Sequence, residues 1–198
     1  MSWQITSEPA TEPVTITEAR EHLRNEDLSG VDDDYVNSLI VAARRFCEGY
    51  TNRVFITQTW RQNENQWRNP IQLKVNPVVS VSSLKYIDSN ETQQTITDST
   101  DNYQKDLNSD VAKIYDGLVN SFPAIGSSIN PIEIITICGY GAASDVPDDI
   151  KHAIKLMISQ FYEFREGVNV PLNSATSDIK IPSSVYSLLN RYRINVFG

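Results

Sequence analysis

Two stretches of the chain repeat apolar residues at the spacing of an α-helix. The first follows an acidic run at residues 32–34, which suits the positive end of a helix dipole, and ends near residues 51–52. The second starts at Pro147 and reaches Phe164. The apolar positions are Val36, Leu39, Ile40, Ala43, Phe46, Cys47 and Tyr50 in the first stretch and Ile150, Ala153, Ile154, Met157, Phe161 and Phe164 in the second. The pattern predicts two long amphipathic helices.

Shorter helices are expected towards both ends of the chain. Thr15 and Glu18 have the spacing of a capping box, in which each side chain satisfies a backbone amide of the other residue. They predict a helix through about residue 24. Pro182 opens a second short helix that carries Val185, Leu188 and Leu189. The residues before the first helix are polar and interrupted by proline, so they predict an arm that is ordered only where something holds it.

The apolar period changes from helical to alternating in the middle of the chain. Alternation over residues 71–75 and 79–86 predicts strands, with a bulge near residues 82–83 where the alternation changes phase. A β-branched run at residues 132–138 predicts a central strand. Short strands are also expected at residues 103–107 and 111–115. The polar residues 89–102 predict an exposed hairpin or loop, and the Gly/Pro/Ser-rich residues 117–130 a connection.

These elements predict an α+β fold with a mainly helical body. The body would consist of the two long amphipathic helices and the short N- and C-terminal helices, with an inserted antiparallel β-region. We expect a single domain over residues 1–198. Its expected parts are a helical body at about 14–53 and 146–193, an inserted β-region at about 54–140, a flexible N-terminal arm at 1–13 and a C-terminal tail at 191–198.

Composition and charge narrow the classes of function. The 198 residues are 40% hydrophobic, which suffices for a core in one domain. The 25 acidic residues outnumber the 17 basic ones and give a net charge of −8, which argues against tight binding to DNA phosphates. No run approaches the roughly 18 apolar residues of a membrane span, and the first residues do not resemble a signal peptide. We therefore expect a protein made in the cytoplasm that does not bind membranes.

Candidate catalytic and cofactor chemistry is weak. The sequence from Gly139 to Ser144 resembles a dinucleotide-binding turn, but Asp148 and Asp149 at the following helix start would repel a pyrophosphate. His22 and His152 lack neighbours at metal-ligand spacing, and a packed or solvated role is favoured.

The remaining candidate residues also favour structural roles. Cys47 and Cys138 suit buried, reduced thiols. The acidic run at residues 32–34 is consecutive at a helix start and therefore favours a dipole role over a calcium loop. No Gly-x-Ser-x-Gly elbow is present. We predict no catalytic residue, no metal site and no cofactor.

Trp60 and Trp67 flank a polar stretch, which leaves two alternatives for their role. Their indole rings could belong to the protein's own core, or they could be buried by another subunit or by a tail component. The sequence supports the two alternatives about equally. Both residues are therefore candidates for an inter-subunit or tail interface.

Spaced motifs over residues 14–193 resemble the head-to-tail connector, or adaptor, family of tailed phages, which docks on the portal ring. The resemblance is carried by TITEAREHLR at 15–24, AARRFCEGYTNR at 42–53, ITQTW at 56–60, NPVVSVSSLKYID at 76–88, GYG at 139–141 followed by VP at 146–147, YEFRE at 162–166 and IPSSVYSLL at 181–189 leading to YR at 192–193. The sequence departs from the family at Cys138, where a small residue is commoner, and in the long polar segments 89–102 and 117–130.

The resemblance implies a non-enzymatic virion protein at the head–tail junction, assembled in the host cytoplasm. It implies a dodecameric ring of copies between the portal protein and a tail-side completion or tail terminator protein. DNA would pass through the lumen without specific binding, and an acidic lumen would favour sliding. Because a closed ring needs a head-to-tail self-contact, the apolar faces would be completed by copies of the chain.

The resemblance also implies that the C-terminal segment engages the portal. Its apolar residues suit insertion into a groove, because a short free end has little other use for them. The candidate portal-binding residues are Arg191, Tyr192, Arg193, Ile194, Val196 and Phe197.

Two alternative functions come from other classes. The first is a small-ligand or regulatory binding module without catalysis, which predicts a compact monomer or dimer with a buried cavity. The second is an enzyme, which would require a nucleophile and base brought together by the fold. The connector predicts rings, or monomers that assemble only on the portal.

Overall fold

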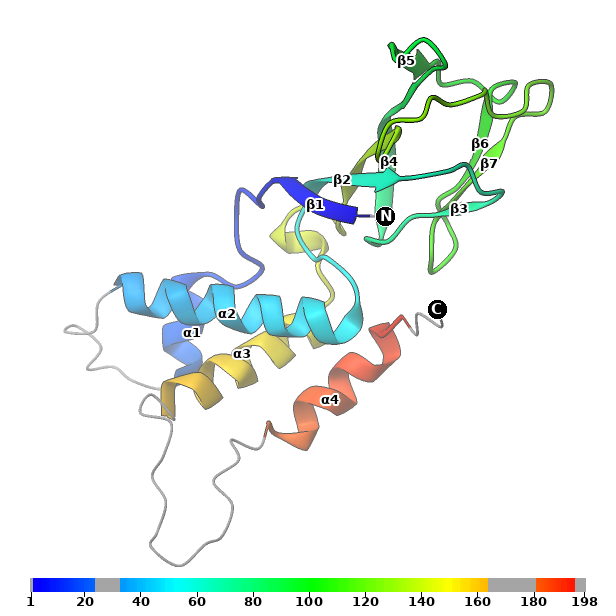
Figure 1. The fold of residues 1–198 in the computed structure, drawn as a ribbon. Coiled ribbons are helices and arrows are strands. Elements are labelled where there is room, and N and C mark those ends of the chain that lie inside the picture. The colour runs from blue at the N-terminus through cyan, green and yellow to red at the C-terminus, as the bar shows by residue number, and fades with distance from the viewer. Residues whose placement is uncertain (1, 24–32, 164–180, 195–198) are drawn as a thin grey trace, which may run out of the picture. The chain divides into compact units, whose positions relative to one another are not determined.

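The computed structural model describes residues 2–23, 33–163 and 181–194, and divides them between two compact units (Figure 1). We call Met1–Ala10 with Arg53–Gly141 the β unit, and Thr11–Asn52 with Ala142–Gly198 the helical unit. The chain passes between them after residues 10, 52 and 141. The strands are β1 (Ser2–Ser7), β2 (Gln58–Glu64), β3 (Ile71–Gln72), β4 (Val78–Ile87), β5 (Gln93–Ile96), β6 (Tyr103–Asp106), β7 (Lys113–Asp116) and β8 (Ile132–Cys138). The helices are α1 (Ile16–Leu23), α2 (Asp33–Thr51), α3 (Asp148–Glu163) and α4 (Ser183–Leu189), with short 3₁₀ turns at Ala143–Asp145 and Asn190–Tyr192.

The β unit contains two antiparallel sheets. The larger has the strand order β1-β2-β8-β4-β5, so the β-branched strand β8 is central, as its composition predicts. The smaller has the order β3-β7-β6. The bulge expected near residues 82–83 is confirmed, because the register of β4 on β8 shifts between Val81 and Ser83. The core of this unit is formed by Val54, Ile71, Leu73, Val78, Val81, Leu84, Tyr103, Ala112, Ile114, Ile132, Ile134 and Cys138.

The turn after β8 requires glycine at residue 139. Gly139 has φ 127°, which L side chains rarely adopt, and a Cβ there would lie 2.6 Å from the carbonyl oxygen of Ile56. Tyr140 then donates its backbone N–H to the carbonyl of Phe55. The glycine turn thus brings the end of β8 against residues 55–57 within the β unit.

Residues 2–7 of the expected N-terminal arm form β1, an edge strand held by β2. Ser2 is opposite Asn63 and Ile5 is opposite Trp60 in this antiparallel pair. The side chains of β1 are exposed apart from that of Ile5, which is half-buried. Backbone hydrogen bonds to β2 are therefore the main interaction that orders this segment, which its polar sequence does not reveal.

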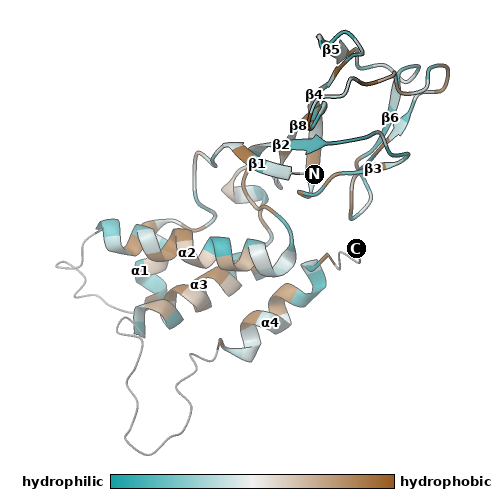
Figure 2. Cartoon of the chain, in the orientation of Figure 1, coloured by the Kyte–Doolittle hydropathy of each residue, from teal (hydrophilic) through white to brown (hydrophobic). Residues whose placement is uncertain are grey.

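The helical unit packs the apolar faces of its helices together. Buried residues include Val36, Leu39, Ile40, Ala43 and Cys47 of α2, Ile150, Ala153, Ile154, Met157 and Ile158 of α3, and Val185 and Leu189 of α4. Figure 2 shows these apolar positions interrupted by polar ones along α2 and α3. On the polar side, His22 and His152 meet edge to face with ring centroids 6.0 Å apart.

A buried ion cluster fastens the start of this unit to α2. The Arg44 side chain is only 4% exposed, and it contacts Glu12 and Glu48 at 2.7 Å each. These two carboxylates hold the pKa of Arg44 above its ordinary value, although burial acts in the opposite direction and is the largest single effect. The residues immediately before α1 are therefore tied to the middle of α2 by charge as well as by apolar contact.

The expected mainly helical body dominated by two long helices is wrong. Helices account for 34% of the described residues and strands for 29%, and the strands form two antiparallel sheets. The β-region is therefore a folded unit with its own core. Its strands were underestimated because β1, β2 and β5 are rich in polar residues, so their apolar alternation is weak.

The capping box of α1 yields a pH-dependent prediction. Thr15 donates its backbone N–H to Glu18 at 2.8 Å, and this bond is the main cause that lowers the pKa of Glu18. The stabilisation of the folded state by the ionised Glu18 is fully present above the pKa of this residue in the unfolded chain, about 4.3. It is lost as the pH falls through the lower pKa of Glu18 in the folded state. Glu18→Gln should reduce the free energy of unfolding by about 0.3–1 kcal/mol at pH 7. The difference from the native chain should shrink towards pH 3, as measured by urea denaturation.

Glu21→Gln is the matched control, because Glu21 is exposed on the same helix. It should leave stability within about 0.5 kcal/mol at both pH values. A deficit of Glu18→Gln that stayed constant down to pH 3 would contradict the assignment.

Candidate functional site

The C-terminal candidate residues do not project freely from the fold up to residue 194. The backbone N–H of Ile194 donates to the carbonyl of Thr51 at 2.9 Å. In return, the Asn52 side-chain amide donates to the carbonyl of Ile194 at 2.9 Å. Ile194 is only 4% exposed, so its apolar side chain is buried within its own subunit. We call these contacts of Ile194 with Thr51 and Asn52 the C-terminal clamp.

Tyr50, in the last turn of α2, fastens the same segment from a second side. Its hydroxyl donates to the Asn190 side-chain oxygen at 2.5 Å. The Arg193 guanidinium lies over the Tyr50 ring at 4.9 Å from its centroid, and the ring of Tyr186 lies 5.0 Å away. Such a cation–π contact contributes about 0.5–1 kcal/mol where it is exposed. Tyr50 therefore connects α2 to both α4 and the segment that follows it.

The first turn of α3 supplies a third attachment through Asp149. Its carboxylate accepts from Arg191 at 2.9 Å and from the Tyr192 hydroxyl at 3.2 Å. Partial burial raises the pKa of Tyr192, and the Asp149 carboxylate adds to this effect. Arg191 is 69% exposed and its ion pair is correspondingly weak. The charged residues of this segment thus remain accessible on one side while being oriented by Asp149.

The candidate portal-binding residues therefore fall into two groups. Arg191, Tyr192, Arg193 and Ile194 lie together on the helical unit, whereas Val196 and Phe197 lie outside the described residues. Sequence reasoning missed Tyr50, Asn52 and Asp149 as the partners of this segment. A signal was available at Asn52, because asparagine just after a predicted helix is typical of a left-handed cap.

Trp60 and Trp67 both find partners inside the β unit. The Trp67 ring stacks on Phe122 with centroids 4.5 Å apart, and its indole N–H donates to the carbonyl of Pro123 at 2.7 Å. Trp60 is half-buried against the β-unit core and donates to the Gln58 side chain at 3.2 Å. The sequence around Trp67 does not reveal its contacts, because Phe122 and Pro123 come from a distant loop. An interface role for either residue stays a prediction.

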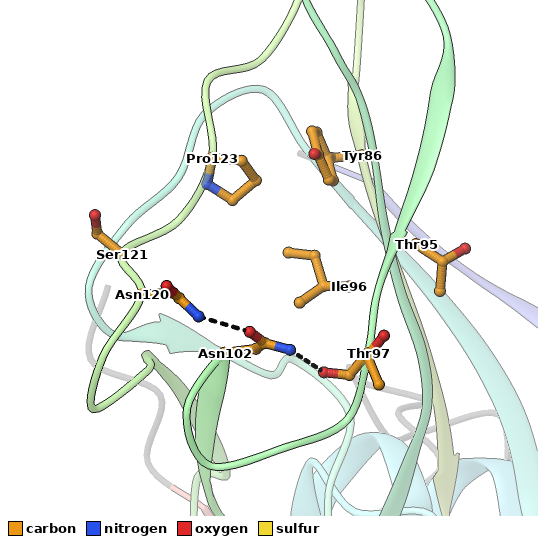
Figure 3. Close-up of a pocket in the computed structure, with 8 residues that line it drawn as sticks. All are labelled: Tyr86, Thr95, Ile96, Thr97, Asn102, Asn120, Ser121 and Pro123. Carbon is orange, nitrogen blue, oxygen red and sulfur yellow. Dashed lines mark hydrogen bonds between the residues drawn. The ribbon is translucent and has the colours of Figure 1, made fainter.

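A hollow in the β unit offers little for a small ligand. It has a volume of about 280 Å³ and opens to solvent between β5 and the 120–123 segment (Figure 3). Tyr86, Ile96 and Pro123 provide apolar surface, and the polar wall is an internal chain in which Asn120 donates to Asn102 and Asn102 to the Thr97 carbonyl. Asn120 and Asn102 are thus hydrogen-bonded within the protein, and the volume falls below that of the usual ligand pocket, about 300–1,000 Å³.

Neither cysteine has the environment of a nucleophile. Burial raises the pKa of Cys47 to about 12 and that of Cys138 to about 11. Among residues 2–23, 33–163 and 181–194, no three His, Cys, Asp or Glu side chains gather as a metal site. Within the same ranges, no helix has the length and apolar character to cross a membrane.

Comparison with known proteins identifies the class of protein. The family model described as phage gp6-like head-tail connector protein matches residues 13–119, which is more than half of the chain. This chain belongs to that family. It is a structural protein that joins head to tail, and its place is the head–tail junction of a virion. No match was found among curated proteins.

Solved structures share the whole fold. The chain is similar to a subunit in the virion of a native gene transfer agent particle, at 23% identity and a TM-score of 0.78. It is also similar to subunits in the neck of the empty particle, computed with C6 symmetry (24%, 0.77), and in the neck of the native particle, computed with C12 symmetry (23%, 0.74). Each match covers 100% of this chain and 98% of the other. At this identity the likeness establishes the fold.

The packing of Trp67 yields a stability prediction. Trp67→Ala should lower the free energy of unfolding by about 2–4 kcal/mol, because it removes the stack on Phe122 and the bond to Pro123. Trp3→Ala is the control, since Trp3 is 52% exposed and should cost less than about 1 kcal/mol. Guanidinium denaturation of both variants measures this. If both variants lost equally little free energy of unfolding, Trp67 would not be a core residue and an interface role would be favoured.

The two thiols should resist modification in the native state. At pH 8 both are protonated and buried, so a thiol reagent should react with neither until the protein unfolds in guanidinium. Ser82→Cys places a reference thiol at an exposed position of β4 and should react at once. Rapid reaction of a native cysteine would show that the unit containing it opens readily.

Proposed function

We propose that copies of this chain close into a ring between the portal protein and a tail-side completion or tail terminator protein. The match to a connector family over residues 13–119 is the observation that carries this proposal. Neck structures that share the fold were computed with C6 and C12 symmetry, which supports a ring and is compatible with a dodecamer. A ring of identical subunits needs a head-to-tail contact that closes after a fixed number of copies.

The portal side of the ring is the C-terminal segment. Residues 190–194 are held in a defined conformation by α2, by Asn52 just after it and by α3, and the sequence then continues through Val196 and Phe197. Arg191 and Arg193 offer exposed charge next to these apolar residues. Because Ile194 is buried in its own subunit, we assign the apolar contact with a portal groove to Val196 and Phe197.

The ring acts as a passive channel for DNA. With 25 acidic and 17 basic residues, the chain is poorly suited to neutralise phosphates, so DNA can slide through the lumen without specific binding. The protein works without a cofactor and without catalysis. The raised pKa values of Cys47 and Cys138 argue only against cysteine nucleophiles, because thiolates are scarce at neutral pH.

Light scattering of the chain with and without the portal protein of the same virus tests the assembly. A single subunit has a mass of 22.3 kDa, and the portal complex should gain a whole ring of such subunits. Deleting residues 195–198 should weaken portal binding roughly tenfold or more, since aromatic anchors dominate such contacts.

Two point variants sharpen the deletion experiment. Phe197→Ala should reproduce most of the loss, whereas Asn195→Ala should change portal binding less than about threefold. Unchanged portal binding after deletion of residues 195–198 would refute the assignment of the C-terminal segment to the portal.

A further inference from the structure

We infer that neighbouring subunits of the ring join through the β unit: β1 of one copy adds as an extra strand along residues Val78–Ser83 of β4 in the next copy. This inference rests on the proposed ring and names the two surfaces that meet in it. Both surfaces belong to the five-stranded sheet and lie at its opposite edges. We call them the β1 edge (Ser2–Ser7) and the β4 edge (Val78–Ser83).

The β1 edge lacks the features that usually protect an edge strand. Among the described strands β1 pairs only with β2, so the backbone N–H and C=O groups on its other side have no strand partner. Such groups are a template for a further strand, and proteins commonly block them with charged residues, with proline or by keeping the strand short. β1 has six residues, none of which is charged or proline. Its sequence therefore leaves this edge open to the addition of a strand.

The β4 edge is the second open edge of the same sheet. β4 has ten residues, and the last four, Leu84–Ile87, pair with β5. Within the described part of the chain, the first six therefore have no strand partner on the side away from β8. These six residues also contain no charge and no proline. The β1 edge and the β4 edge thus match in length and in the absence of charge.

The other edge strands of the β unit are short or charged. β3 has two residues, and β6 has four, including Lys105 and Asp106. β5 also has four residues, and Glu91 and Asp98 lie two positions beyond its ends. Short length and charge both discourage pairing with another chain. Of the edges that the structure describes, the β1 and β4 edges are therefore the ones suited to an intermolecular pair.

Each of the two edges carries a large apolar side chain that a single subunit leaves in water. Trp3 is 52% exposed and Val79 is 56% exposed. They are two of the five large hydrophobic side chains exposed among the described residues, and the other three lie in the 117–130 segment. Val79 has no partner on β8, because the register shifts between Val78 and Ser80. Pairing of the two edges removes apolar surface of both residues from water.

The occupant of each edge is a second copy of this chain, because a closed ring requires two different surfaces to meet. In a head-to-tail ring every copy offers one surface to the preceding copy and another to the next. Opposite edges of one sheet meet this requirement. The net charge of −8 favours the same pair, since copies repel one another wherever acidic residues face each other. Neither edge contributes a charge, so negatively charged subunits can approach closely there.

Cross-linking of the complex with the portal protein tests this contact. The double variant Trp3→Cys with Val79→Cys places one thiol on each edge, and a short bismaleimide should link successive copies into a ladder of multimers. Native Cys47 and Cys138 are buried and should not react. Either single variant should give no product larger than a dimer, because one thiol per copy can be linked only once. Trp3→Cys with Leu118→Cys is the matched control, since Leu118 is exposed but lies outside both edges, and it should give no ladder.

Charged variants test the same contact without a cross-linker. Trp3→Lys and Val79→Lys each place a charge on one edge and should raise the subunit concentration needed for half-saturation of the portal about tenfold or more. Unfolding of the subunit by guanidinium should stay close to that of the native chain, because both side chains are exposed. Trp3→Lys combined with Val79→Glu should restore assembly, since opposite charges of successive copies then meet. Leu118→Lys is the control and should assemble like the native chain.

The outcomes separate this inference from the proposed function. If light scattering finds no ring on the portal with the native chain, the proposed function fails. If the ring forms but the double cysteine variant gives no more multimers than the Leu118 control, or if Trp3→Lys assembles like the native chain, the edge contact is overturned and the ring stands. Efficient dimer formation by Trp3→Cys alone would also overturn it, because two β1 edges would then pair with each other.

Discussion

The structure of the C-terminal segment depends on how α2 ends. A helix cannot satisfy its own last carbonyls, and those of a buried end must find donors elsewhere. Thr51 is fully buried, and its carbonyl receives the amide of Ile194, 143 positions further along the chain. This single requirement places the end of the described chain beside the end of α2. Tyr50 and Asp149 then orient the residues leading to it, and the side chain of Ile194 is buried within its own subunit.

The two units are stabilised by different interactions. The helical unit is held by apolar helix faces and by the cluster of Arg44, Glu12 and Glu48, in which two carboxylates pair with the buried guanidinium. The β unit is held by backbone pairing across a central β-branched strand and by aromatic contacts that recruit loop residues such as Phe122. Among the described residues of both units, no three His, Cys, Asp or Glu side chains gather as a metal site.

The sequence predicts the elements that have a regular apolar period, but it does not predict the contacts between distant segments. Apolar repeats located α2, α3 and β8, and the phase change near Ser82 located a bulge. Spaced motifs also indicated the connector family. The sequence predicts too little strand relative to helix, because β1 and β2 carry mostly polar side chains and are stabilised by backbone pairing. The hydrogen-bond partners of Trp67 and Ile194 lie 56 and 143 positions away, and no local pattern encodes such pairs.

The passage of the chain between the units after residues 10, 52 and 141 has a consequence for biosynthesis. As the polypeptide emerges from the ribosome, α1 and α2 appear early but lack α3, which buries their apolar faces. The β unit can complete its sheets once Cys138 has emerged, before the helical unit is whole. The Ile194 amide that completes α2 is synthesised only after all the strands of both sheets. A chain that stops before Ile194 therefore lacks the donor that satisfies the buried carbonyl of Thr51.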